Sequence, residues 1–211
     1  CDLTLDGKTE RDLYFYEAQL RTFQAHGLDR NPWDSAVQYK TNILDKDAFA
    51  PDSGFEATYR FNVLTGFIKL PLAVVVERPH LFQVFINGER VEPLKGRWWL
   101  DKAFGLFNGN WKLGENTITL KARPFTIHTE LEPVYIIGSF FLKAADPGFV
   151  VIPGGEMKLG AWKDQGLPFY ADRVAYTKSV RIPEDAIGKM RFAVELGSWL
   201  GSVAEVKVNG R

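Results

Sequence analysis

The sequence predicts a mainly β protein built around an antiparallel sandwich. Apolar and polar side chains alternate over residues 55–63, and several more short apolar runs follow at intervals of about 8–12 residues, separated by Gly, Pro and Asn. Hydrophobic residues make up 45% of the 211, which is enough for a proper core. We expect a helical cap or linker over 1–50, a sandwich over 51–145, and a linker plus the first part of a second sandwich over 146–211.

The N-terminal segment is expected to be helical. Thr9 is suited to cap the first helix and Gly27 to end it. Within residues 12–23, apolar side chains recur at spacings of three and four, which predicts an amphipathic helix with this inward face: Leu13, Tyr16, Leu20 and Phe23. A second helix is expected over 35–49, where Val37, Ile43 and Leu44 are candidates for its buried side.

From residue 51 onward the pattern is that of β-strands. Asn87-Gly88 is a strong hairpin signal, because both positions of such a two-residue turn take positive φ. The alternation over 55–63 predicts a half-buried strand. Five further stretches are expected to be strands: 72–76, 82–86, 98–107, 114–120 and 134–142.

An internal repeat links the two halves of the chain. Leu72–Arg90 matches Arg191–Arg211 with two residues inserted in the loop, and upstream 55–63 corresponds to 174–182. In the first copy, further strands follow the Asn-Gly turn. Since Asn209-Gly210 calls for a following strand too, we expect the second sandwich to be truncated and the sequence to derive from a longer parent protein.

Charge and hydropathy exclude several classes of partner. Lys and Arg number 26, as do Asp and Glu, so the chain lacks the basic field that nucleic acid or an anionic membrane would require. No stretch approaches the ~18 apolar residues of a membrane-spanning helix. The single cysteine, Cys1, excludes a disulfide framework. It is either the lipid-bearing first residue of a processed lipoprotein or a point where a longer chain was cut.

No metal or cofactor is expected, although calcium is compatible with the sequence. Three scattered His and one Cys exclude a zinc-type site. Asp45, Asp47 and Asp52 loosely suggest calcium ligands, but they lack the order of an EF-hand loop. A solvated helix end is the better interpretation.

Aromatic residues reach 14% of the chain, and its tryptophans are the candidates for carbohydrate binding. Trp98 and Trp99 are adjacent, so on a strand one points inward and one outward. Trp111, Trp162 and Trp199 each lie beside turn residues, in the loops where sandwiches usually bind ligands. We therefore assign a sugar-stacking role to Trp98, Trp111, Trp162 and Trp199, with core or loop anchoring as the alternative for each.

The sequence supports no catalytic residue. Glu130 and Glu132 alternate as on one face of a strand, which would place them ~7 Å apart, a separation that lies between the two used by glycosidases and so does not exclude an acid–base pair. Such pairs usually come from different elements, however, so solvated carboxylates or an ion pair with Arg are favoured. There is no Gly-x-Ser-x-Gly elbow and no phosphate-binding glycine loop.

Several motifs together resemble the C-terminal β-sandwich region of large bacterial glycoside hydrolases of the α-L-rhamnosidase-like type. The motifs span nearly the whole chain: Asn31-Pro32-Trp33-Asp34-Ser35-Ala36-Val37-Gln38, Ser53-Gly54-Phe55, Val76-Glu77-Arg78-Pro79, Trp98-Trp99-Leu100-Asp101, Glu130-x-Glu132-Pro133-x-Tyr135 and Gly160-x-Trp162-x-x-Gln165-Gly166-x-Pro168-Phe169-Tyr170. The Asn-Gly turn and the Gly-Glu-Asn strand resemble the galactose-binding-type jelly roll of such enzymes.

The resemblance implies an accessory role in a secreted, periplasmic or cell-surface enzyme. In such hydrolases the catalytic carboxylates lie in an upstream (α/β)8 barrel, and no stretch of this sequence alternates strand and helix in that way. The expected partners are therefore that barrel and a carbohydrate. A stand-alone lectin-like module and a protein-interaction domain are the alternatives, because fold analogy does not choose among them.

Overall fold

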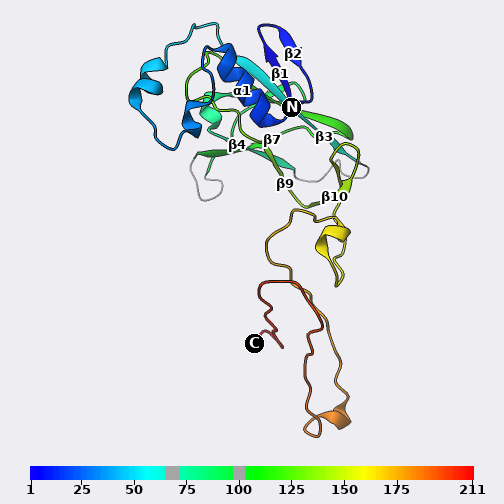
Figure 1. Cartoon of the computed structure of the whole chain (residues 1–211). Helices are drawn as coiled ribbons and strands as arrows, with labels where there is room; N and C mark the ends of the chain where they lie inside the picture. The colour runs from blue at the N-terminus through cyan, green and yellow to red at the C-terminus, as the bar shows by residue number, and fades with distance from the viewer. Residues whose placement is uncertain (65–71, 97–102) are drawn as a thin grey trace. The chain divides into compact units, whose positions relative to one another are not determined.

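The computed structural model describes residues 1–64, 72–96 and 103–211. They form two compact units, Cys1–Asp172 and Arg173–Arg211. The described residues of the first unit form a sheet of eight strands and a sheet of three, so the predicted mainly β class is confirmed (Figure 1). No helix within the described residues is both long and apolar enough to cross a membrane.

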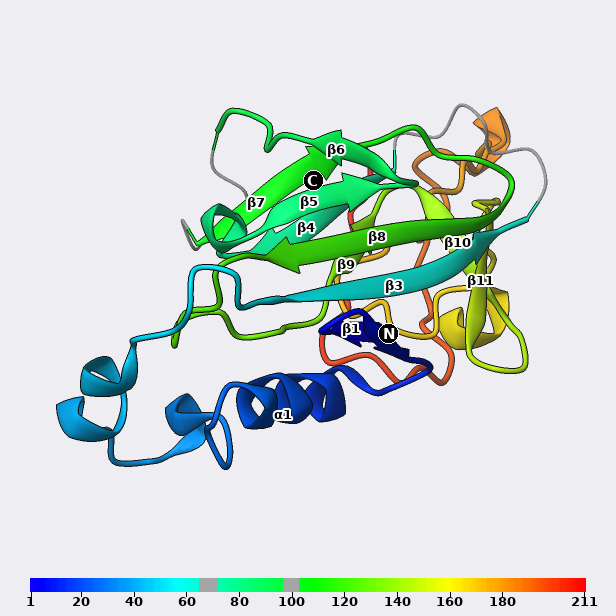
Figure 2. The same ribbon diagram turned by 90° about the horizontal axis from the view of Figure 1, so that it is seen from above.

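The larger sheet is built around its two longest strands, β3 and β8 (Figure 2). The main path runs β10-β11-β3-β8-β5-β6, while β1 pairs with β3 and β2 pairs with β1. All its pairs are antiparallel except β11 with β3. Its strands are β1 (Asp2–Leu5), β2 (Lys8–Glu10), β3 (Phe55–Val63), β5 (Gln83–Ile86), β6 (Glu89–Val91), β8 (Gly114–Ala122), β10 (Phe140–Ala144) and β11 (Phe149–Pro153).

The smaller sheet supplies the second layer. Its order is β7-β4-β9, formed by β4 (Ala73–Glu77), β7 (Phe104–Asn108) and β9 (Tyr135–Ile137). β4 has an unbroken run of buried residues over its first four positions, as expected for a strand that is covered on both faces. The strands predicted over 55–63, 72–76, 82–86 and 114–120 are therefore confirmed. Residues 98–102 of the strand predicted over 98–107 lie outside the described residues.

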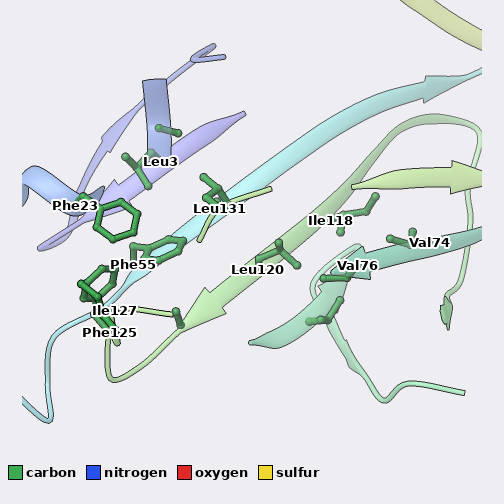
Figure 3. Close-up of a cluster of buried hydrophobic side chains, with 14 of the residues drawn as sticks. Leu3, Phe23, Phe55, Val74, Val76, Ile118, Leu120, Phe125, Ile127 and Leu131 are labelled. Atoms are coloured by element: carbon green, nitrogen blue, oxygen red, sulfur yellow. The ribbon is translucent and has the colours of Figure 1, made fainter. Parts of the chain in front are cut away.

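The hydrophobic core lies between the two sheets and continues toward the N-terminal helix (Figure 3). Ile118 and Leu120 of β8 belong to the same buried cluster as Val74 and Val76 of β4. All four are at most 2% exposed. Alternation along β8 directs every second side chain into this layer.

The Asn87-Gly88 turn has the predicted conformation. Its φ angles are 50° and 83°, and Ile86 pairs with Glu89 across it. Positive φ at both positions matches the turn to the right-handed twist of the flanking strands.

The N-terminal helix exists, but its predicted start is wrong and its predicted buried face is only partly right, since Phe23 is buried whereas Tyr16 and Leu20 are exposed. α1 spans Phe15–Ala25 and is followed by Gly27, as predicted, whereas Thr9 lies in β2. Tyr16 is 56% exposed. The helix packs beside β1, and its buried residues are Ala18, Gln19, Thr22 and Phe23.

The second predicted helix, over 35–49, is also wrong. Only two single-turn 3-10 helices form there, η2 (Lys40–Asn42) and η3 (Leu44–Lys46). Ile43 is buried between them, while Val37 and Leu44 are exposed. One buried side chain cannot hold a regular helix against a core, because short helices depend on tertiary packing.

The stretch predicted as one strand over 134–142 is two strands in different sheets. β9 ends at Ile137 in the smaller sheet, and β10 begins at Phe140 in the larger one. Gly138 lies between them with φ 155°, a conformation that other residues rarely adopt. β11 then continues the larger sheet beyond residue 145.

The second unit contains no strand, although the structure describes all of its residues, 173–211. Its one regular element is the 3-10 helix η6 (Glu184–Ala186). The strand expected over 174–182 and those of the repeat over 191–211 are therefore not formed. Backbone groups of an extended segment become a strand only when a neighbouring strand pairs with them, and here none does.

Candidate functional site

Three of the quoted motifs meet in one polar cluster, the Glu130 cluster, which we define as Asn31, Arg78, Glu130 and Glu132. Asn31 precedes the 3-10 helix η1 (Pro32–Asp34), and Arg78 lies between β4 and the 3-10 helix η4 (Pro79–Leu81). The two glutamates belong to the irregular segment 123–134. The prediction that they lie on a strand is wrong.

Asn31 is the buried centre of the cluster, only 2% exposed. Its Oδ1 accepts a hydrogen bond from the backbone N–H of Trp33 at 3.0 Å, which caps η1. Its Nδ2 donates to Glu130 Oε1 at 2.8 Å and to Gln19 Oε1 at 3.2 Å. One amide therefore joins helix α1, η1 and the segment that carries Glu130.

Arg78 binds the other oxygen of Glu130. The guanidinium Nη1 donates to Glu130 Oε2 at 2.8 Å. Arg78 adopts a left-handed backbone conformation with φ 45°, an unfavourable one for a residue with a Cβ. Its own N–H donates to the carbonyl of Ala103 at 2.6 Å, which helps to hold the backbone there. Both oxygens of Glu130 are thus occupied by groups of the same chain.

Trp33 fixes the same irregular segment from the other side. Its Nε1 donates to the carbonyl of Ile127 at 2.7 Å, and its ring lies 5.2 Å from that of His128, centroid to centroid. The N–H of Ile127 donates to Asp47 Oδ1 at 2.8 Å. Asp47 is therefore an exposed carboxylate that also serves as an acceptor for the backbone of this segment.

Glu132 is electrostatically different from Glu130. Burial raises the pKa of its carboxyl, and the negative charges of Glu77 and Glu130 raise it further, while Arg78 opposes them. The hydroxyl of Tyr59 donates to the backbone carbonyl of Glu132 at 2.7 Å. Burial also raises the pKa of Tyr59, so this phenol remains a donor.

The polar contacts of the Glu130 cluster connect separate elements of the fold. Glu130 has an Arg partner, which confirms the ion-pair alternative expected for it. A carboxylate with both oxygens bound in this way holds three distant segments together, because separating it from Asn31 and Arg78 would leave charged and polar groups unpaired. Sequence reasoning did not predict Asn31 or Arg78 as its partners. Their presence in short motifs was the only available signal.

Trp111 is an anchor in the core. Its Nε1 donates to the carbonyl of Leu72 at 2.7 Å, and its ring lies 5.6 Å from that of Phe61. It packs partly buried against both hydrophobic clusters. Trp98 and Trp99 lie outside the described residues.

Trp162 lies in a loop that carries several aromatic side chains, residues 158–170, which we call the Trp162 loop. It begins the 3-10 helix η5 (Trp162–Gln165), and its ring meets that of Tyr170 edge to face at 6.0 Å. Gln165 closes the loop: its Oε1 accepts from the N–H of Lys158 at 2.8 Å, and its Nε2 donates to the carbonyl of Lys158 at 3.0 Å. Phe169 in the same loop is 71% exposed, so the loop presents an aromatic surface.

Trp199 lies in the second unit and is 48% exposed. Trp111 is in the core, and Trp162 is in the loop after β11, while Trp199 is in the other unit.

The acidic residues considered for calcium do not converge. Asp45 forms an ion pair with Lys40, and Asp47 accepts from Ile127. In the part of the chain that the structure describes, no group of three or more His, Cys, Asp or Glu side chains is arranged to hold a metal ion.

Comparison with known proteins adds no family to this description. No protein-family model matches the chain, and no curated protein matches it. The function is therefore argued from the Glu130 cluster and the Trp162 loop themselves.

Proposed function

We propose that this chain is a non-catalytic accessory β-sandwich region of a bacterial glycan-degrading glycoside hydrolase, with the sandwich of jelly-roll type. Its role is to support the catalytic domain and to contact carbohydrate, in a secreted, periplasmic or cell-surface enzyme. The Glu130 cluster carries the proposal, because three of the motifs that resemble those of such hydrolases meet there and hold distant segments together.

The occupied oxygens of Glu130 favour support over catalysis. A general acid or base must reach a substrate proton, and Asn31 and Arg78 already hold both oxygens of this carboxylate. The pKa of Glu132 is raised by burial and then by the negative charges of Glu77 and Glu130. Glu130 and Glu132 lie two residues apart on one segment, whereas the carboxylates of a glycosidase flank the scissile bond.

Carbohydrate contact is best supported at the Trp162 loop. Sugar rings stack on exposed aromatic faces, and the loop carries Phe169 and Tyr170 at 71% and 43% exposure. This surface also favours the second candidate, a stand-alone lectin-like module, which would bind soluble glycan without any catalytic partner.

Enzyme assays with the parent protein and with the chain alone test the accessory role. Replacing Glu130 by Ala in the parent enzyme should lower its melting temperature and leave KM and kcat unchanged at temperatures where it stays folded. The chain alone should hydrolyse no aryl glycoside. Turnover by the chain alone, or loss of kcat in a folded Glu130→Ala enzyme, would contradict the proposal.

Calorimetric titration with oligosaccharides separates the two candidates. Sugar binding by the isolated chain, abolished by Trp162→Ala and retained by the exposed control Leu159→Ala, favours the lectin-like module. Binding that needs the parent enzyme favours the accessory role.

A further inference from the structure

A cavity of about 220 Å³ lies where the end of helix α1 meets two loops. His26 after the last turn of α1 lines it, together with Asp6 between β1 and β2 and with Asp52 and Ser53 of the loop before β3. The cavity shares no lining residue with the Glu130 cluster or the Trp162 loop. Pockets for drug-sized ligands measure ~300–1,000 Å³, so this one fits a molecule the size of a single sugar ring.

The imidazole of His26 is held in one orientation. Its ring stacks on that of Phe125 with the centroids 3.9 Å apart and the planes at 16°, and the ring of Phe49 meets it edge to face at 6.0 Å. Its Nδ1 lies 2.7 Å from the carbonyl oxygen of Thr22. Because a carbonyl only accepts, Nδ1 carries the hydrogen, and Nε2 of the neutral ring is an acceptor. No described residue is bonded to Nε2.

The loop before β3 is fixed as well. Ser53 Oγ donates to the carbonyl of Ala50 at 2.6 Å and accepts from the backbone N–H of Phe125 at 3.2 Å. Gly54 has φ 144°, and a Cβ there would clash with the carbonyl oxygen of Ala122, so glycine lets the loop pass close to the end of β8. A site that is fixed before binding costs less conformational entropy to occupy.

The cavity carries negative charge that its lining does not compensate. Asp6 and Asp52 are exposed, and neither side chain has a hydrogen bond or an ion pair with a described residue. The C-terminal end of α1 adds partial negative charge, and its last turn has no basic residue to offset it. None of the described residues that line the cavity is Lys or Arg. The potential in the cavity therefore favours a cation.

Three acceptors from three elements match the three donors of an ammonium group. They are the carboxylates of Asp6 and Asp52 and Nε2 of His26. An alkylammonium has three N–H donors and no acceptor. Across residues 1–64, 72–96 and 103–211, no three His, Cys, Asp or Glu side chains are arranged to hold a metal ion, so an organic cation is the better fit.

We propose that this cavity binds one amino sugar unit through its ammonium group. The ammonium of a 2-amino-2-deoxyhexose would donate to Asp6, Asp52 and His26, and the sugar ring would fill the remaining volume. This inference rests on the proposed contact with carbohydrate, to which it adds a class of sugar and a place of contact separate from the Trp162 loop. N-acetylation of the amine would remove the charge that the cavity recognises.

Nuclear magnetic resonance titration of the full chain with D-glucosamine at neutral pH tests the proposal. Backbone amide shifts should change saturably at residues 5–7, 25–26 and 50–54, with a Kd in the millimolar range. N-acetyl-D-glucosamine, which has a similar ring but no charge, should shift none of these amides. Equal binding of the two sugars would overturn the ammonium assignment, and unchanged shifts at these residues would overturn the proposal as a whole.

Matched variants locate the ammonium group. Asp6→Asn retains a residue type that tolerates the turn's φ of 48°, and Asp52→Asn retains the shape of the side chain. Each should weaken D-glucosamine binding about fivefold. The control Asp29→Asn removes the same charge from an exposed residue outside the cavity and should change Kd less than about twofold. Binding that neither cavity variant weakens would overturn the proposal.

A further variant separates this proposal from the proposed function. Trp162→Ala should leave D-glucosamine binding unchanged, because Trp162 does not line the cavity. If Trp162→Ala abolishes the shifts, the sugar binds at the Trp162 loop, and the cavity proposal is overturned while carbohydrate contact stands. Hydrolysis of an aryl glycoside by the chain alone would contradict the accessory role and would leave the cavity result as measured.

Discussion

The two copies of the repeat have the same sequence pattern, but only the first copy is paired with neighbouring strands. Val84 and Ile86 of the first copy are buried between two sheets, while their equivalents Val206 and Val208 face solvent beside the same turn. The turn forms in both copies because its φ angles depend on Asn and Gly alone. The strands form in only one, because a strand requires hydrogen-bond partners from elsewhere in the chain.

The comparison also explains where the stability of the first unit lies. Burying a Val or Ile side chain contributes about 1.5–3 kcal/mol relative to exposure. Val74, Val76, Val84 and Ile86 all receive this contribution, and the aligned residues of the second unit do not. Substitutions at aligned positions of the two copies should therefore lower the free energy of unfolding by very different amounts.

The largest difference is expected for the core isoleucine of the hairpin. Ile86→Ala should lower the free energy of unfolding by about 2–5 kcal/mol, because it leaves a cavity opposite Ile118. The aligned change Val208→Ala should stay within about 0.5 kcal/mol of wild type. Urea denaturation followed by tryptophan fluorescence measures both. Equal losses would show that the second unit is packed as well.

The Asn-Gly turns should give the next largest difference. Asn87→Ala removes hydrogen bonds to Asn116 and Thr117. It also leaves alanine at φ 50°, where no side-chain hydrogen bond offsets the unfavourable backbone conformation. A loss of about 2–3 kcal/mol is expected. Asn209→Ala retains the free energy of unfolding of the first unit within about 0.5 kcal/mol. Thermal melts of the two variants compare them, and a larger effect at Asn209 would contradict the assignment.

Removing a carboxylate should distinguish the Glu130 cluster from a surface ion pair. Glu130→Ala leaves Asn31 and Arg78 without their acceptor and should cost about 1–3 kcal/mol. In the second unit, Glu205 lies 3.3 Å from Lys207 in an exposed ion pair. Glu205→Ala should change stability by less than about 0.5 kcal/mol. The chemical denaturation midpoints of the two variants provide the measurement. If Glu130→Ala left the stability unchanged, the Glu130 cluster would not hold the three segments together.

The smallest effect is expected from Glu132 and depends on pH. Burial and the neighbouring carboxylates raise its pKa in the folded state, so protonation favours folding. This contribution is complete below the ordinary pKa of glutamate, about 4.3. It is lost as the pH rises through the raised folded-state value.

Glu132→Gln should therefore gain stability over wild type as the pH rises through that window, and the gain should then level off. Melting temperatures of both proteins from about pH 4 to about pH 8 test the sign. A gain that is largest at the acidic end would contradict it.

Local patterns predicted the strands better than the helices. The period of two over 55–63 matched β3 at both ends, because alternation reports burial on one face of a sheet. The helical face predicted within 12–23 was only partly right. Phe23 is buried as expected, but Leu20 is 40% exposed whereas Ala18 and Thr22 are buried, because packing against the rest of the fold decides which side of the helix turns inward.

The sequence singled out the motifs that contain the residues of the Glu130 cluster, but it did not show that these residues meet. Glu130 and Glu132 stood out by spacing, yet the strand expected for them does not exist. Asn31 and Arg78 lie 99 and 52 residues from Glu130, so nothing local indicated that they hold its two oxygens. Trp111 was expected beside a loop, and only packing showed that its indole bonds to Leu72 in the core.

The amino-acid sequence alone determined the mainly β class, the position of β3 and the conformation of both Asn-Gly turns. These depend on side-chain alternation and on backbone preferences within a few residues. The tertiary structure alone decided which copy of the repeat has its strands paired and how Glu130 is held. Pairing and polar contacts join residues far apart in sequence, so their free energy depends on partners that no local pattern specifies.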